Sequence, residues 1–130
     1  MLKGVQSAAD AVRAADVGCD GVVVTNHAGR QVDGAVGSLE MLPEIVAAVG
    51  TRVKIIFDSG VRTGADVFKA LALGAHVVEV GRLYIWGMAH EGEYGCRHVM
   101  KSLLAVRPAC ARSVLGCALT ASAGRTWTSS

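Results

Sequence analysis

The sequence predicts an α/β fold in which short strands and helices alternate along the chain. Three alanine-rich helical stretches end at Gly18, Gly50 and Gly74, and a β-branched run follows soon after each glycine. Glycine tolerates the left-handed conformation that commonly ends a helix. The β-branched runs are apolar throughout, which is typical of parallel strands covered on both faces. The alternation therefore indicates right-handed crossovers and a parallel sheet.

The first half of the chain supplies two pairs of strand and helix. Residues 2–5 are expected to hold the end of a first strand, and the alanine-rich residues 7–17 a first helix. A second strand is expected over 21–25. The apolar residues of 39–49 form one face of a second helix, which Ser38 is expected to cap because serine is a preferred capping residue.

The second half repeats this pattern. A third strand is expected over 53–58 and a fourth over 77–81. Thr63 and Asp66 have the spacing of a capping box, with Asp in place of the usual Glu, and are expected to open the third helix. Residues 91–104 are expected to form the fourth helix.

The number of these units limits the architecture. Their spacing fits either a (β/α) barrel or a doubly wound sheet. A complete eight-unit barrel takes about 250 residues, whereas this chain has 130. If the fold is a TIM barrel, the chain therefore holds four of its β/α units, which is half of the barrel.

Composition narrows the class of protein. Hydrophobic residues make up 52% and charged residues 18%, and the mean hydropathy is +0.40, so the chain is apolar enough for a packed core. The net charge of +2 gives no reason to expect nucleic acid or an anionic membrane as a partner. The four cysteines show no C-x-x-C spacing, so we expect no metal site.

Targeting signals are the next feature of the sequence. No apolar run reaches the roughly 20 residues of a membrane span, and the first residues lack the apolar region of a signal peptide. The last residues match no peroxisomal address. We therefore expect an intracellular chain and assign it to the cytoplasm.

Polar residues collect where the predicted strands end, which is the functional edge of parallel α/β folds. Gly60 and Gly81 let backbone N–H groups approach a ligand, and Arg62 and Arg82 supply forked donors. The start of the third helix adds its positive end. These features favour a phosphate site. The alternative is that Asp58 and the two arginines merely pair with one another.

The loop after the second predicted strand suggests a different task. Arg30 can clamp a carboxylate through two parallel hydrogen bonds. His27 can move a proton near neutral pH. A base beside a carboxylate clamp suits the oxidation of a 2-hydroxy acid. The alternative is a hydrogen-bonded surface histidine. Trp86, after the fourth strand, is expected to serve packing.

Five motifs in series resemble one known family. Their order and spacing over residues 2–105 closely resemble the C-terminal half of the FMN-dependent 2-hydroxy-acid dehydrogenases and oxidases, which include glycolate oxidase, lactate oxidase and monooxygenase, and flavocytochrome b2. The resemblance implies the last four units of a TIM barrel. The motifs are Lys3–Val5, Thr25–Gln31, Phe57–Arg62, Asp66–Ala75 and Gly81-Arg82.

The resemblance implies FMN as cofactor, a small 2-hydroxy acid as substrate, and a role for each site residue. Lys3 would lie against the flavin and stabilise its reduced form, and Thr25 would touch the ring. His27 would be the catalytic base and Arg30 the clamp for the substrate carboxylate. Two loops would hold the flavin phosphate through Asp58, Ser59, Gly60, Val61, Arg62, Gly81 and Arg82.

Some features depart from the family pattern. Ala28 and Ser59 stand where the family usually has glycine. The first four β/α units of the family have no counterpart here, and the carboxylate that orients the histidine belongs to them. Residues 106–130 lack acidic side chains and diverge from the family. We expect this tail to be disordered or poorly packed, with Pro108 ending any helix.

The sequence therefore predicts a half-barrel over 1–105 followed by a divergent tail over 106–130. Three readings of its function stay open. The chain is an FMN-dependent 2-hydroxy-acid dehydrogenase, or a half-barrel that binds FMN or phosphate without turnover, or a nonfunctional fragment. Whether this chain alone is an enzyme is undecided. Because a lone half-barrel exposes two sheet edges, we expect self-association to cover them.

Overall fold

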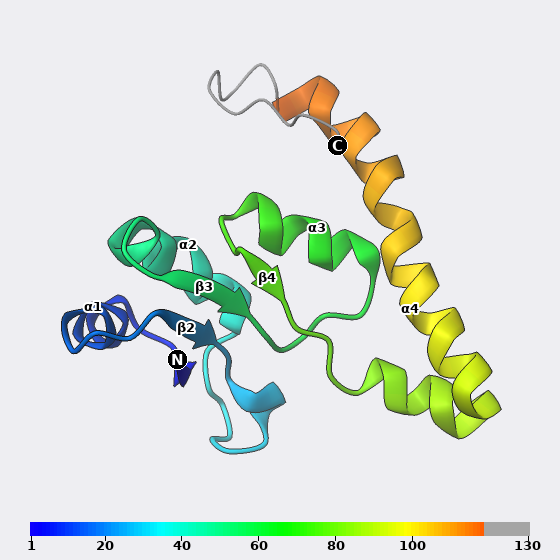
Figure 1. Cartoon of the computed structure of the whole chain (residues 1–130), viewed down its shortest axis with the longest axis horizontal. Helices are drawn as coiled ribbons and strands as arrows, with labels where there is room; N and C mark the ends of the chain where they lie inside the picture. The colour runs from blue at the N-terminus through cyan, green and yellow to red at the C-terminus, as the bar shows by residue number, and fades with distance from the viewer. Residues whose placement is uncertain (119–130) are drawn as a thin grey trace.

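A computed structural model describes residues 1–118, and the side chains of residues 1–105. Parallel strands alternate with α-helices along the chain, as predicted (Figure 1). A short 3-10 helix, η1, follows the second strand. The elements are β1 (Leu2–Val5), α1 (Ala8–Asp16), β2 (Gly21–Val24), η1 (His27–Gly29), α2 (Ser38–Val49), β3 (Lys54–Phe57), α3 (Gly64–Ala72), β4 (Val77–Val78) and α4 (Leu83–Ala118).

The strands form one parallel sheet in the order β1-β2-β3-β4. Val24 pairs with Phe57, and Phe57 with Val78, so these strands end at the same edge of the sheet. Strand β4 is shorter than the predicted 77–81, because the chain leaves the ladder with β3 soon after Val78. After Val78 the ladder holds one more bond, from Glu79 N to Phe57 O at 2.8 Å, before the chain turns towards α4.

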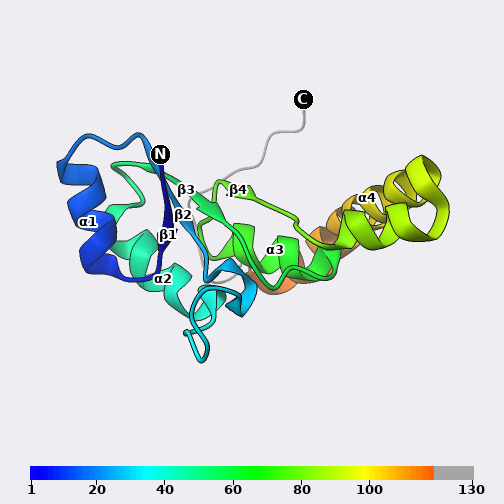
Figure 2. The same cartoon turned by 90° about the horizontal axis from the view of Figure 1, so that it is seen from below.

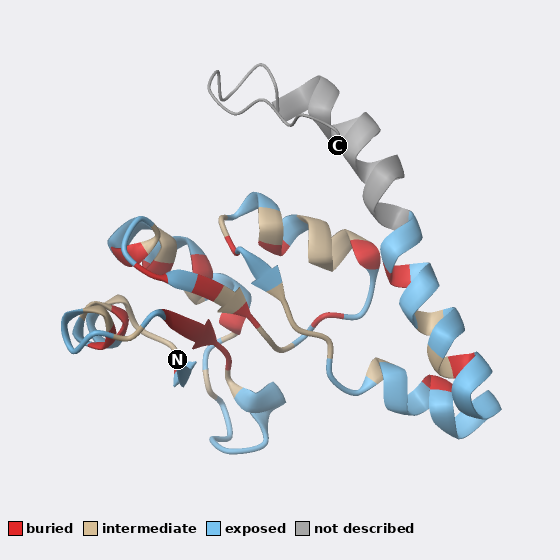
Figure 3. Cartoon of the chain, viewed as in Figure 1, coloured by how far each residue is buried: buried red, intermediate tan, exposed pale blue. Residues whose placement is uncertain are grey.

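The core lies between the sheet and the helices that cover one of its faces. Val22 of β2 and Ile55 of β3 are fully buried against Leu42, Ile45 and Val49 of α2. Figure 3 shows the buried residues concentrated in β2, β3 and the inward sides of the helices. Burying each of these aliphatic side chains contributes about 1.5–3 kcal/mol, so this layer is the main stabilising contact of the fold.

The other face of the sheet carries less cover. Side chains alternate along a strand, so Lys54 and Ile56 of β3 point away from Ile55 and the core. Lys54 is exposed and Ile56 is partly buried. On β4, Val77 is 50% exposed. Within residues 1–118, β1 and β4 are edge strands with one partner each.

Helix starts follow the predicted capping only in part. The capping box of α3 is confirmed, because Thr63 and Asp66 bond to each other's backbone N–H. The prediction that Ser38 caps α2 is wrong, since Gly37 is the N-cap residue and makes no side-chain cap bond. The Ser38 hydroxyl instead accepts the N–H of Asn26 at 2.8 Å, which ties the start of α2 to the loop after β2.

Helix α4 differs most from the prediction. It spans 36 residues, with a break at Glu91 and Gly92, so the expected start of the helix is the point where two helical arms meet. The arms pack through Gly87 and Gly95, whose backbones leave no room for a side chain. Figure 2 shows α4 extending from the α3 end of the molecule, away from α1. No described helix is both long and apolar enough to cross a membrane.

The tail lies partly inside the described residues. Helix α4 continues past Pro108 to Ala118, so the expectation that Pro108 ends the helix is wrong. A proline removes one backbone N–H donor, and the bonds on either side of it can still continue the helix. Residues 119–130 lie outside the described part of the chain, and the division at residue 105 stays a prediction.

Candidate functional site

A cleft of about 830 Å³ lies where the strands β2, β3 and β4 end. All the predicted site residues except Lys3 and Thr25 line it. The residues around the cleft come from the loop after β2, the loop between β3 and α3, and the segment from β4 into α4. They are His27, Ala28, Arg30, Gln31, Asp58, Ser59, Gly60, Val61, Arg62, Glu79, Gly81, Arg82, Leu83 and Trp86.

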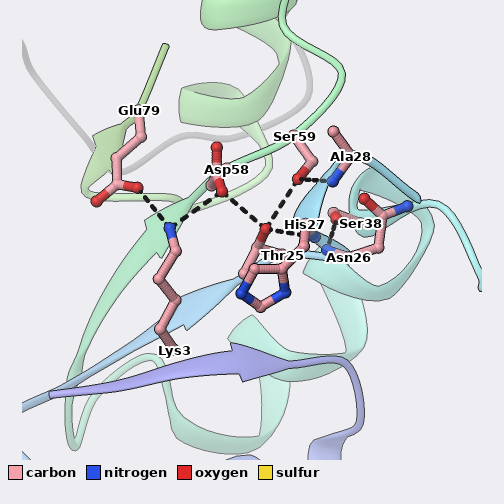
Figure 4. A network of polar contacts seen from close by, with 9 residues as sticks. All are labelled: Lys3, Thr25, Asn26, His27, Ala28, Ser38, Asp58, Ser59 and Glu79. Atoms are coloured by element: carbon pink, nitrogen blue, oxygen red, sulfur yellow. Dashed lines mark hydrogen bonds and ion pairs between the residues drawn. The ribbon is translucent and has the colours of Figure 1, made fainter. Parts of the chain in front are cut away.

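A polar network joins the strand ends beside this cleft (Figure 4). The Lys3 ammonium on β1 lies 3.1 Å from Asp58 Oδ2 and 2.9 Å from Glu79 Oε2. The Thr25 hydroxyl donates to the same Asp58 oxygen at 2.7 Å. Lys3 and Thr25 are thus connected to the cleft through Asp58. One lysine links the first strand to the loops after the third and fourth strands.

The network shifts two pKa values in opposite directions. Partial burial alone would lower the pKa of Lys3, but its hydrogen bonds to Glu79 and Asp58 and their charges outweigh this and raise it. Burial likewise opposes ionisation of Asp58, yet the hydrogen bonds from Thr25 and Lys3 and the lysine charge hold its pKa below the ordinary value. The two shifts therefore favour the ion pair between the Lys3 ammonium and the Asp58 carboxylate.

A second set of bonds joins the loop after β3 to the loop after β2. The Ser59 hydroxyl lies 2.8 Å from Thr25 Oγ1 and accepts the Ala28 N–H at 3.1 Å. Thr25 Oγ1 also accepts the His27 N–H at 3.0 Å. Ser59 has φ of +89°, and Gly60 beside it +78°. Ser59 therefore occupies a backbone region in which a residue with a Cβ is strained.

His27 lies at the rim of the cleft and is exposed. His27 and Ala28 both have φ of +55°, so the chain turns sharply directly after β2. The imidazole packs against Gly4 of β1, since a Cβ at Gly4 would lie 3.4 Å from His27 Cε1. Among residues 1–105, no side chain forms a hydrogen bond with the His27 ring. The ring is therefore positioned by its backbone and by Gly4.

Three arginines surround the cleft. Arg30, Arg62 and Arg82 are exposed and all line it. Asp58 pairs with Lys3, and within residues 1–105 none of these arginines forms an ion pair, so the alternative of Asp58–arginine pairing is not what the chain adopts. Their guanidinium groups thus remain available to an anionic ligand.

The start of α3 contributes less to an anion site than the sequence suggested. Asp66 Oδ2 accepts the N–H groups of Arg62 at 3.1 Å and of Thr63 at 2.9 Å. These hydrogen bonds hold the pKa of Asp66 down against the opposing effect of burial. A carboxylate of the protein itself therefore occupies the two N–H groups that directly precede the helix. Within residues 1–105, the N–H groups of Gly64 and Ala65 donate to no backbone carbonyl, so they remain open to an anion beside the arginine side chains and the glycine loops.

Comparison with known proteins identifies the family. The model of a family described as FMN-dependent dehydrogenase matches residues 1–124. This chain belongs to the FMN-dependent dehydrogenase family. The match extends beyond residue 105, at which the predicted half-barrel ends. FMN is the cofactor of this family, which confirms the predicted cofactor class and the resemblance noted above.

The relatives of this FMN-dependent dehydrogenase chain are much longer than it is. An FMN-dependent alpha-hydroxy acid dehydrogenase of Penicillium citrinum is 60% identical over 105 residues, which cover 81% of this chain and 26% of that protein. An L-lactate oxidase of Nostoc is 47% identical, with coverage of 90% and 32%. A 4-hydroxymandelate oxidase of Amycolatopsis orientalis is 47% identical, with coverage of 96% and 35%.

Solved structures give the same result for the fold. A mandelate oxidase variant with an FMN adduct superposes with a TM-score of 0.79 at 49% identity, covering 84% of this chain and 35% of that one. A lactate oxidase of Pediococcus acidilactici gives a TM-score of 0.81 at 46% identity, with coverage of 85% and 31%. The four-stranded parallel sheet is part of a TIM barrel, as predicted.

The donor groups at the cleft fit the phosphate of FMN. A Cβ added at Gly60 or Gly81 would meet no atom within 4 Å, so the backbone there is open to a ligand. Within residues 1–105, the N–H groups of Gly60 and Gly81 donate to no backbone carbonyl. Arg62 and Arg82 flank the same loops. Two arginines beside open backbone N–H groups suit a dianionic phosphate.

Five residues that line the cleft were not predicted as site residues, namely Ala28, Gln31, Glu79, Leu83 and Trp86. Glu79 is the acidic residue within the otherwise apolar run 77–81, and this isolated charge was the signal that could have identified it. Trp86 was expected to serve packing, but its side chain is 72% exposed and lines the cleft. Its position at the start of α4 could not be found because the predicted fourth helix began later in the chain.

Proposed function

We propose that this chain binds FMN in the strand-end cleft and oxidises a small 2-hydroxy acid to the 2-oxo acid. One observation carries the proposal: the candidate base His27, the candidate carboxylate clamp Arg30 and the phosphate-binding candidates Arg62 and Arg82 all line one cleft. Relatives named as L-lactate oxidase and 4-hydroxymandelate oxidase support this substrate class.

The two residues after β2 divide the work on the substrate. Arg30 holds the substrate carboxylate through its planar pair of N–H donors. His27 accepts a proton from the substrate at a ring nitrogen, as a general base does. When bound, FMN supplies the acceptor for the two electrons that leave the substrate.

The remaining site residues hold the cofactor. Arg62 and Arg82, with the backbone N–H groups of Gly60 and Gly81, bind the phosphate. Lys3, whose ammonium pairs with Asp58 and Glu79, would stabilise the reduced flavin by its charge. The remaining cofactor contacts come from the Thr25 hydroxyl, which touches the flavin ring, and from Asp58, Ser59 and Val61 in the phosphate-binding loop.

A second function is FMN binding without turnover. Its support is that no described side chain bonds to the His27 imidazole, so nothing within residues 1–105 fixes its tautomer. The chain also spans about a quarter to a third of the length of the relatives it matches. Groups supplied by the rest of the relatives' length are then needed for turnover.

A second copy of the chain would complete the half-barrel. Both edge strands, β1 and β4, have one partner within the described residues, and Val77 on the open face is half-exposed. Unpaired parallel edges favour association. Sedimentation of the full chain is expected to give a species of twice the chain mass. A monomer at all concentrations contradicts this part of the proposal.

The test separates binding from turnover. The full chain is titrated with FMN, and lactate or glycolate is then added without oxygen while the flavin absorbance is followed. In wild-type protein the flavin absorbance is expected to fall as the substrate reduces FMN. His27→Ala is expected to bind FMN nearly as tightly, and its flavin absorbance is expected to fall at least about 100-fold more slowly. His98→Ala, on the exposed surface of α4, is the matched control.

Three outcomes are informative. Bleaching of His27→Ala at the wild-type rate contradicts the assignment of the base. Binding of FMN by wild-type protein without bleaching supports the second function. No binding of FMN contradicts both functions.

A further inference from the structure

We propose that Ser59 is a positioning residue, whose hydroxyl fixes His27 relative to the loop that follows β3. Its importance for catalysis rests on the proposed function, in which His27 is the base. The link itself is a property of this chain and is testable without cofactor.

Ser59 has an unusual backbone conformation. Its φ of +89° lies where glycine is favoured, and the next residue, Gly60, has φ of +78°. A Cβ in this region costs conformational energy. Surrounding contacts must therefore hold Ser59 in this conformation. Its backbone bonds to Asp58, and its hydroxyl makes two further contacts.

The hydrogen bonds between Ser59, Thr25 and Asp58 all run in one direction. Thr25 has one hydroxyl proton, which it donates to the ionised Asp58 carboxylate at 2.7 Å. In the 2.8 Å contact between the two hydroxyls, Ser59 must then be the donor and Thr25 the acceptor. Ser59 Oγ in turn accepts the Ala28 N–H at 3.1 Å. A single directed chain runs from Ala28 through Ser59 and Thr25 to Asp58.

These hydrogen bonds also reach His27. Thr25 Oγ1 accepts the His27 N–H at 3.0 Å, so two consecutive N–H groups after β2 end on two hydroxyls (Figure 4). His27 and Ala28 are the two residues with φ of +55°. The hydroxyl pair therefore holds the sharp turn that directs the imidazole towards Gly4. Thr25 alone holds only one of these two N–H groups.

Two substitutions separate the hydroxyl from the backbone strain. Ser59→Ala keeps the Cβ and the strain but removes the hydroxyl, whereas Ser59→Gly removes both. Ser102→Ala is the control, because the Ser102 hydroxyl bonds to His98 O on α4, far along the chain from the cleft. The amide of Ile55 in β3 reports in each variant that the fold is intact.

Amide exchange and ring contacts are measured by NMR on the full chain without FMN. In both Ser59 variants the Ala28 amide is expected to exchange roughly tenfold faster than in wild type, as loss of one hydrogen bond implies. The cross-peak between the His27 ring proton on Cε1 and the Gly4 α-protons is expected to weaken. Ser102→Ala should change neither signal.

The outcomes distinguish this proposal from the proposed function. Wild-type Ala28 exchange and an unchanged His27–Gly4 cross-peak in Ser59→Ala would overturn the positioning role, whether or not the protein turns over. Loss of both signals with Ile55 still protected supports it even if wild-type protein fails to oxidise a hydroxy acid. Where wild-type protein turns over, Ser59→Ala is expected to lower kcat more than it changes KM.

Discussion

Asp58 joins Lys3 and Thr25 in the polar network beside the cleft. It accepts hydrogen bonds from Lys3 and Thr25 through one carboxylate oxygen, and its side chain is 20% exposed, against 43% for Glu79. Exposed ion pairs contribute little, about 0–1 kcal/mol. Both carboxylates hold Lys3: the contact with Glu79 is shorter, at 2.9 Å against 3.1 Å, whereas Asp58 is the less exposed of the two partners.

Substitution of Glu79 tests this arrangement. Glu79→Gln removes one of the two carboxylates that raise the pKa of Lys3. The Lys3 pKa is expected to fall, because the neutral amide no longer stabilises the ammonium by its charge. The NMR titration of the lysine Cε carbons measures it. Asp16→Asn, which breaks the distant pair with Arg52, should leave Lys3 unchanged, and an equal fall in both variants argues against a direct contact.

The depressed pKa of Asp58 makes stability depend on pH. Folding favours its ionised form, so this stabilisation is fully present above the unfolded pKa of about 3.9 and is lost as the pH falls through the lower folded pKa. Urea unfolding is expected to show the free energy of unfolding declining in this acidic window. Asp58→Asn should flatten the decline, with Asp66 leaving a residual slope. A slope equal to that of wild type would contradict the assignment.

At the scale of elements, the start of α3 illustrates a competition between stability and ligand binding. Asp66 satisfies the N–H groups of Arg62 and Thr63, and Thr63 returns a bond to the Asp66 N–H at 3.3 Å. The Asp66 carboxylate in the first turn lowers the attraction of that helix end for an outside anion, although the N–H groups of Gly64 and Ala65 bond to no backbone carbonyl within residues 1–105. Phosphate binding is therefore expected to depend mainly on the arginine side chains and the glycine loops.

Loss of the capping box is expected to destabilise the fold. Thr63→Ala removes the side-chain oxygen that caps α3 and should lower the free energy of unfolding by about 1 kcal/mol. Thr51→Ala, at an exposed turn before β3, is expected to have little effect. Chemical denaturation measures both. Equal stabilities for the two variants would show that the box contributes nothing.

Local signals predicted most elements, and tertiary contacts decided the rest. Strands and helices up to α3 follow from apolar runs, glycine stops and the Thr63–Asp66 spacing. The role of Ser38 could not be predicted, because its bond to Asn26 joins two segments. Neither could the two arms of α4, which meet through Gly87 and Gly95.

The site was predictable as a set of residues but not as a network. Strand-end placement identified the cleft residues, since parallel strands end at one edge. The pairing of Lys3 with Glu79 across the sheet depends on its three-dimensional course, and the sequence carries no spacing rule for it. The replacement of the family's usual glycine by Ser59 pointed to an unusual φ, and the structure shows its value of +89°.

At the scale of the whole molecule, the chain forms the strand-end cleft of a barrel but supplies only four of its strands within the described residues. Its four strands carry the candidate base, clamp and phosphate ligands. One sheet face and both sheet edges have little cover within the described residues. We therefore propose that this half-barrel forms an FMN site and that association with a second copy supplies the missing cover.

The most direct test is a fluorescence titration of the full chain with FMN, comparing wild type with Arg62→Ala. We predict saturable binding, weakened at least about tenfold in Arg62→Ala because a charged hydrogen-bonding partner of the phosphate is lost. Arg97→Ala, whose partner is Glu93 on α4, should bind as wild type does. Absence of saturable binding, or equal affinities for wild type and Arg62→Ala, would contradict the claim.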